Sequence, residues 1–122
     1  MIGYVTVGTN DLKKATAFYD QLLVAFGAKR GWEAEKFISW TTGPNAPMLL
    51  AIQPADGKAA TVGNGMMVAL LATSKSQVDT VYRKALELGG KDEGPAGPRG
   101  EGFYAGYFRD LDGNKLAVFF AG

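Results

Sequence analysis

The chain has 122 residues, 47% of them hydrophobic, which is the size and apolar content of one globular domain with its own core. Thirteen Lys and Arg residues against twelve Asp and Glu give a formal net charge of +1 without a basic block, so we expect neither a nucleic acid nor a membrane partner. Cysteine and histidine are absent, which excludes disulfides, thiol chemistry and metal sites built from these two side chains.

The first half predicts a strand, a helix and three short strands. Residues 2–8 are rich in β-branched side chains, and Asn10 and Asp11 then offer caps for a helix with one apolar stripe. Gly27 is a suitable end for this helix. Strand-like runs follow at 29–32, 37–41 and 48–53. The predicted order is βαβββ.

The second half begins the same pattern again. A strand is predicted over 66–72, then Ser74 as a helix cap and Gly89-Gly90 as the helix stop. The separation between Gly27 and Gly90 equals that between Tyr19 and Tyr82, so the two halves match at one constant sequence offset. A Gly- and Pro-rich stretch over 94–102 is interpreted as an inserted surface loop, before strands near 103–109 and 115–120.

This repeat predicts an α+β fold in a single domain of two βαβββ modules, about 1–60 and 64–122. One such half cannot bury both faces of its sheet, so we expect the halves to form a curved mixed sheet with the helices outside. The concave face would then be a natural pocket.

Four segments in order along the chain carry a resemblance to a known family. They are Tyr4-Val5-Thr6-Val7 before Asn10-Asp11-Leu12, then Ala17-Phe18-Tyr19, Gly63-Asn64-Gly65 before a strand, and Tyr107-Phe108-Arg109-Asp110-Leu111-Asp112-Gly113-Asn114-Lys115. Together they resemble the glyoxalase/bleomycin resistance/dioxygenase family, also called the vicinal oxygen chelate superfamily. The resemblance covers essentially the whole chain. It implies paired modules, assembly as a homodimer, and a site inside the curved sheet.

In metal-dependent members of that family, His, Gln or Glu side chains hold a divalent ion. By the resemblance, these positions fall at Tyr4, Leu49, Met67 and Ala117. Thioether and methyl groups cannot replace oxygen or imidazole donors, and Tyr4 could coordinate only as a phenolate despite an unperturbed pKa of about 10. The resemblance therefore implies a member that needs no metal or other cofactor and binds a small apolar or aromatic molecule.

Strand alternation adds further candidates for the pocket, because every second side chain faces the same way. The predicted lining is Tyr4, Thr6, Trp40, Leu49, Met67, Tyr104, Tyr107, Ala117 and Phe119. The rings of Trp40, Tyr104 and Tyr107 could instead fill the core or a dimer interface. Arg99 and Glu101 are candidate polar contacts of a lid formed by the 94–102 stretch.

Other readings of the sequence remain open. A lyase or dioxygenase-type enzyme with an atypical site, or an isomerase-like catalyst using Tyr4 and a glutamate, is one alternative. Its acid or base groups would have to come from Tyr4, Arg30, Glu33, Glu35 or Arg99, although a solvated edge explains the two glutamates more simply. A dimerising module with its pocket packed shut is a third hypothesis. Residues 110–114 begin like a calcium loop, but Ala121 stands where its terminal Glu belongs, so we predict a hairpin turn.

No apolar stretch approaches the roughly 18 to 20 residues of a membrane span, and the N-terminus lacks the features of a signal peptide. A cytoplasmic location is the expectation.

Overall fold

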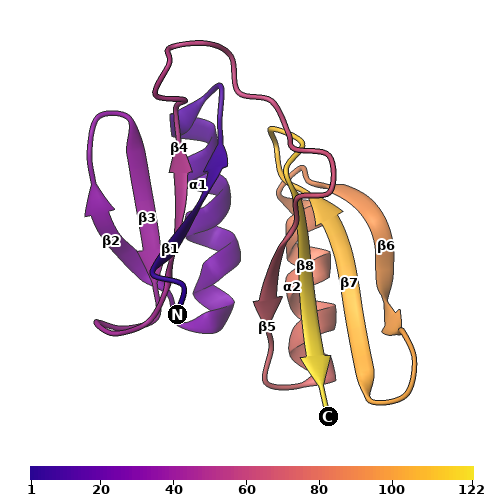
Figure 1. Ribbon diagram of the computed structural model, residues 1–122. Helices are drawn as coiled ribbons and strands as arrows, with labels where there is room; N and C mark the ends of the chain where they lie inside the picture. The colour runs from indigo at the N-terminus through magenta and orange to yellow at the C-terminus, as the bar shows by residue number, and fades with distance from the viewer. The chain divides into compact units, whose positions relative to one another are not determined.

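The computed structural model describes residues 1–122, which divide into two compact units, Met1–Thr61 and Val62–Gly122. Each unit contains a four-stranded sheet and one α-helix that packs across one face of that sheet (Figure 1). No helix is both long and apolar enough to span a bilayer.

Unit 1 has the predicted order of elements. Its elements are β1 (Tyr4–Gly8), α1 (Leu12–Leu22), the 3-10 turn η1 (Leu23–Phe26), β2 (Lys29–Glu33), β3 (Phe37–Thr41) and β4 (Met48–Ile52). The strands lie in the order β1-β4-β3-β2, with β1 parallel to β4 and the other pairs antiparallel.

Unit 2 repeats this arrangement. Its elements are β5 (Val68–Leu71), α2 (Lys75–Glu87), β6 (Lys91–Pro98), β7 (Phe103–Arg109) and β8 (Lys115–Ala121). The order β5-β8-β7-β6, with β5 parallel to β8, matches that of unit 1. The prediction of an α+β fold with two βαβββ modules is confirmed, and the strands form two four-stranded mixed sheets.

The helix ends use the predicted capping residues. The Asp11 carboxylate accepts a 3.1 Å hydrogen bond from the Lys14 backbone N–H, and the Ser74 hydroxyl accepts one of 3.0 Å from Gln77. Gly27 ends η1 in the left-handed conformation with φ of 73°, which an L side chain rarely adopts. Both helices therefore begin where the sequence predicts.

Each helix buries one apolar stripe against its own sheet. The buried residues of α1 are Ala15, Phe18, Tyr19 and Leu22, and those of α2 are Val78, Val81 and Ala85. Each large apolar side chain removed from water in this way contributes about 1.5 to 3 kcal/mol to folding. The other face of each sheet is not covered by the unit's own helix, and we call it the helix-free face.

One prediction about the second half is wrong: residues 94–98 are part of strand β6 and not of a surface loop. β6 is the edge strand of its sheet, so Pro95 and Pro98 can lie in it without removing an N–H from a central ladder. Irregular register between Asp92 and Gly97 accommodates the glycines. Only residues 99–102 form the turn to β7.

Candidate functional site

Alternate side chains of β1 are exposed on the helix-free face of unit 1. Tyr4 and Thr6 lie on this face, whereas Val7 is buried on the helix side. The strand register places Met48 beside Tyr4, and Leu50 beside Thr6. The Tyr4 side chain is 53% exposed, which is unusual for a large aromatic residue and leaves its ring available for contact.

Trp40 and Leu49 lie on the opposite face, so the prediction that they line the pocket is wrong. The Trp40 indole N–H donates a 2.9 Å hydrogen bond to Asp20 of α1, and its ring centroid lies 5.4 Å from that of Tyr19. Leu49 pairs with Trp40 in the ladder and therefore shares the helix side. The ladder puts Leu50 in the position predicted for Leu49, one residue further along β4.

Trp32 belongs to the helix-free face, which strand alternation along the sequence does not predict. The register between β2 and β3 shifts between Arg30 and Glu33, so both Gly31 and Trp32 lie opposite Ser39. The Trp32 backbone N–H donates a 2.6 Å hydrogen bond to the Ser39 hydroxyl. Such a bulge redirects a side chain from one face to the other. Gly31 inside a predicted strand was the available signal.

The helix-free face of unit 2 is apolar and aromatic along β5, β7 and β8. Ala69 pairs with Ala117, and Leu71 with Phe119, so these side chains share one face with Tyr107, the other partner of Ala117. The Phe103 and Phe119 rings stack there, with centroids 5.4 Å apart. Met67 precedes β5 and is 43% exposed.

Tyr104 points to the helix instead, which corrects the prediction that it lines the pocket. Its hydroxyl donates a 2.7 Å hydrogen bond to Asp79 of α2. This bond to a carboxylate, with a smaller contribution from desolvation, raises the pKa of Tyr104 above 10. Tyr104 therefore belongs to the contact between α2 and its sheet.

Cationic side chains gather around Tyr107 on the helix-free face of unit 2. The guanidinium carbon of Arg99 lies 5.5 Å from the Tyr107 ring centroid, and the Lys115 ammonium nitrogen lies 5.7 Å from it. Such cation–π distances are favourable. Arg99 also donates to the carbonyl oxygens of Pro95 and Pro98, which ties it to β6.

Glu101, the other candidate for a lid contact, lies exposed in the turn between β6 and β7. Because β6 pairs with β7 as far as Pro98, a lid could include only the turn over residues 99–102. The lid itself stays a prediction.

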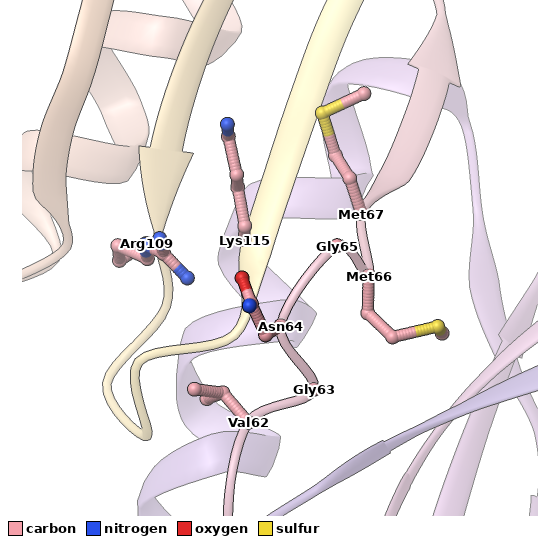
Figure 2. Close-up of a pocket in the computed structure, with 8 residues that line it drawn as sticks. All are labelled: Val62, Gly63, Asn64, Gly65, Met66, Met67, Arg109 and Lys115. Carbon is pink, nitrogen blue, oxygen red and sulfur yellow. The ribbon is translucent and has the colours of Figure 1, made fainter.

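A pocket of about 510 Å³ includes Lys115 in its lining, and residues of unit 2 alone form it. It is lined by Val62, Gly63, Asn64, Gly65, Met66, Met67, Arg109 and Lys115. Figure 2 shows the three nitrogen-bearing side chains on one side and the two methionine sulfurs on the other. The segment before β5 and the β7–β8 hairpin together form this pocket.

The residues at the positions implied for metal ligands do not fit a divalent ion. With the register corrected, these positions hold Tyr4, Leu50, Met67 and Ala117. Of these side chains, only the Tyr4 phenol carries an oxygen, and divalent ions of this kind need several oxygen or imidazole donors. No group of three or more carboxylate side chains elsewhere is placed to hold a metal.

Two of the candidate acid and base residues of unit 1, Arg30 and Glu33, form a surface ion-pair cluster with Asp20. The Arg30 guanidinium makes two hydrogen bonds to Asp20, of 3.0 and 2.6 Å, and one of 3.0 Å to Glu33. The bonds from Arg30 lower the pKa of Asp20, with a smaller contribution from Trp40. Glu35 is exposed. This cluster joins α1 to β2 and lies away from the helix-free face.

Residues 110–114 form the predicted hairpin turn between β7 and β8. The buried Asp110 carboxylate accepts hydrogen bonds of 2.9 Å from the backbone N–H groups of Asp112 and Asn114, and from the Asn114 side chain. The carboxylate is thus part of the turn itself.

The paired βαβββ modules agree with the comparisons to known proteins. The family model described as the Glyoxalase/Bleomycin resistance protein/Dioxygenase superfamily matches residues 1–118. The chain therefore belongs to this superfamily, as its sequence resemblance indicated. A search of curated proteins found no match.

Solved structures agree with this assignment. The chain is 32% identical to a glyoxalase/bleomycin resistance protein from Albidiferax ferrireducens T118, with a TM-score of 0.92 and coverage of 100% of this chain and 99% of that one. A lactoylglutathione lyase from Agrobacterium tumefaciens is 23% identical, with a TM-score of 0.73 and coverage of 98% and 92%. A glyoxalase-related enzyme from Fulvimarina pelagi is 22% identical, with a TM-score of 0.77 and coverage of 98% and 87%. The last two show the fold alone.

Proposed function

We propose that this member of the superfamily binds a small apolar or aromatic molecule on its helix-free sheet faces, without a metal. The proposal rests on the chemistry of the side chains at the four positions implied for metal ligands. These positions are occupied by Tyr4, Leu50, Met67 and Ala117. These groups favour apolar contact and stacking over coordination.

The exposure of large apolar side chains on the same faces supports the proposal. Tyr4 and Trp32 in unit 1, and Met67 and Leu71 in unit 2, are each between 43% and 65% exposed. Large apolar side chains grouped on one surface mark sites of ligand or protein contact. The stacked rings of Phe103 and Phe119 offer an aromatic surface beside Leu71.

A ligand-observed NMR screen of small aromatic compounds, run with and without a chelator, tests this function. We expect binding that the chelator does not change. Phe119→Ala removes a ring of the helix-free face and is expected to weaken binding by about tenfold. The neighbouring Phe120→Ala is the matched control, because the alternation of β8 places Phe120 on the helix side.

Two results would contradict the proposal. One is a tightly bound, stoichiometric divalent metal in the purified protein, which would favour the lyase or dioxygenase-type alternative. The other is a screen without binding together with a stable dimer whose interface contains Tyr4 or Phe119, which would favour a dimerising module. Assembly as a homodimer otherwise stays a prediction from the family resemblance.

A further inference from the structure

The pocket of unit 2 contains more positive charge than its own carboxylates neutralise. Two cations line it, Arg109 on β7 and Lys115 on β8, and they are cross-strand neighbours. The Arg109 Nε–H donates a 2.6 Å bond to Glu93, and this pair compensates one charge. Lys115 has no carboxylate within 4.0 Å and lies over the Tyr107 ring instead. One positive charge therefore faces the pocket uncompensated.

Hydrogen-bond donors accompany this charge. Arg109 uses its Nε–H for Glu93 and one Nη1–H for the Gly113 carbonyl oxygen, at 3.1 Å. Since a guanidinium has five donors, the Nη2 hydrogens remain for another acceptor. The Asn64 amide adds two donors in the same pocket (Figure 2).

The opposite side of the pocket is apolar. Met66 and Met67 line it and are 63% and 43% exposed (Figure 2). Methionine adapts its shape to flat apolar and aromatic groups and contacts aromatic rings favourably. The pocket therefore offers a cationic, donor-rich side and an apolar side to the same molecule.

From this division we infer that the pocket binds a small aromatic acid, with its carboxylate on Arg109 and Lys115 and its ring against Met66 and Met67. A monoanion matches the single uncompensated charge better than a phosphate dianion does. This inference rests on the proposed function and specifies its ligand class.

The test compares 2-naphthoate with its neutral analogue 2-naphthamide by isothermal titration calorimetry. We expect the acid to bind at least about tenfold more tightly than the amide, since a hydrogen bond to a charged group is worth that factor or more. Affinity for the acid should fall as salt is added. Lys115→Gln should weaken binding of the acid about tenfold and leave binding of the amide unchanged.

Arg83→Gln is the matched control, because Arg83 is an exposed cation on α2 in the same unit and makes no ion pair. It should bind both probes as the unmodified protein does. Circular dichroism would verify that both variants are folded.

The outcomes separate this inference from the proposed function. Equal binding of acid and amide, or loss of both in Lys115→Gln, would overturn the inference and leave the proposed function in place. Binding of 2-naphthyl phosphate more than tenfold tighter than 2-naphthoate would overturn the assignment of a carboxylate. Absence of binding by both naphthyl probes would overturn the inference, while the broader aromatic screen would still decide the proposed function.

Discussion

The rings of Tyr4 and Trp32 meet edge to face, with centroids 5.7 Å apart and planes at 76°. These residues lie on β1 and β2, the two edge strands of the sheet in unit 1, with β4 and β3 between them. Their side chains thus reach toward each other across the two central strands. A ligand bound on this face would contact or separate these two rings.

Replacing each tryptophan by phenylalanine tests the faces that the structure assigns to them. Trp40→Phe removes the hydrogen bond to Asp20 from a buried residue, and we expect it to lower the free energy of unfolding by about 1 to 3 kcal/mol. Trp32→Phe, at a half-exposed site, should cost less than about 0.5 kcal/mol. Urea unfolding followed by far-ultraviolet circular dichroism measures both. Similar losses of stability in the two variants would contradict the faces assigned to the two tryptophans.

The Asp20 carboxylate should make the free energy of unfolding depend on pH in the acidic range. Hydrogen bonds from Arg30 lower the pKa of Asp20 in the folded protein below the ordinary 3.8. The Asp20 carboxylate therefore stabilises the folded protein above pH 3.8, and this stabilisation is lost as the pH falls through the lowered pKa of the folded protein. The urea midpoint of Asp20→Asn should therefore lie below that of the unmodified protein near pH 6. The gap should close toward pH 2. A gap that is constant with pH would refute this role.

Gly90→Ala is expected to destabilise the protein by about 1 to 3 kcal/mol. An added Cβ would lie 2.7 Å from the Arg109 carbonyl oxygen and 2.8 Å from that of Ala85, and backbone atoms cannot move away cheaply. Gly3→Ala is the control, since nothing lies within 4 Å of its added Cβ. Thermal unfolding should separate the two variants by several degrees. Equal melting temperatures would show that the close approach is absent.

Asp110→Ala should lower the free energy of unfolding by about 1 to 3 kcal/mol, because it leaves two backbone N–H groups of the β7–β8 turn without their acceptor. Asp110→Asn keeps one side-chain oxygen as an acceptor, so its free energy of unfolding should fall by less. Denaturant unfolding measures both variants. If they are equally destabilised, the negative charge of Asp110 matters more than its hydrogen bonds to the backbone.

Local signals explain which elements could be predicted. Asp11, Ser74 and Gly27 act within one helical turn, and both helix stripes repeat at helical spacing, so neither needed the tertiary structure. Residues 94–98 were predicted incorrectly because Pro and Gly favour loops locally. Their place at a sheet edge, where a missing N–H is tolerated, depends on the strand order.

Face assignments depend on register, which short-range patterns determine weakly. The prediction took Leu49 for Leu50, and a shift of one residue reverses every side chain of a strand. Trp32 was missed because a bulge breaks the alternation at Gly31, and Trp40 was misplaced because its partner Asp20 lies on another element. Tyr104 was misplaced in the same way by its bond to Asp79.

The sequence by itself determined the repeated βαβββ order, the starts of the helices and the family, because caps, periodicity and motifs act over a few neighbouring residues. It also determined that the positions implied for metal ligands carry groups with little capacity to bind a metal. Only the tertiary structure decided which aromatic rings face away from the helices, and that Arg109, Lys115 and the segment before β5 form one pocket. Strand pairing across long sequence separations and a single bulge control those contacts, and neither leaves a reliable local signal.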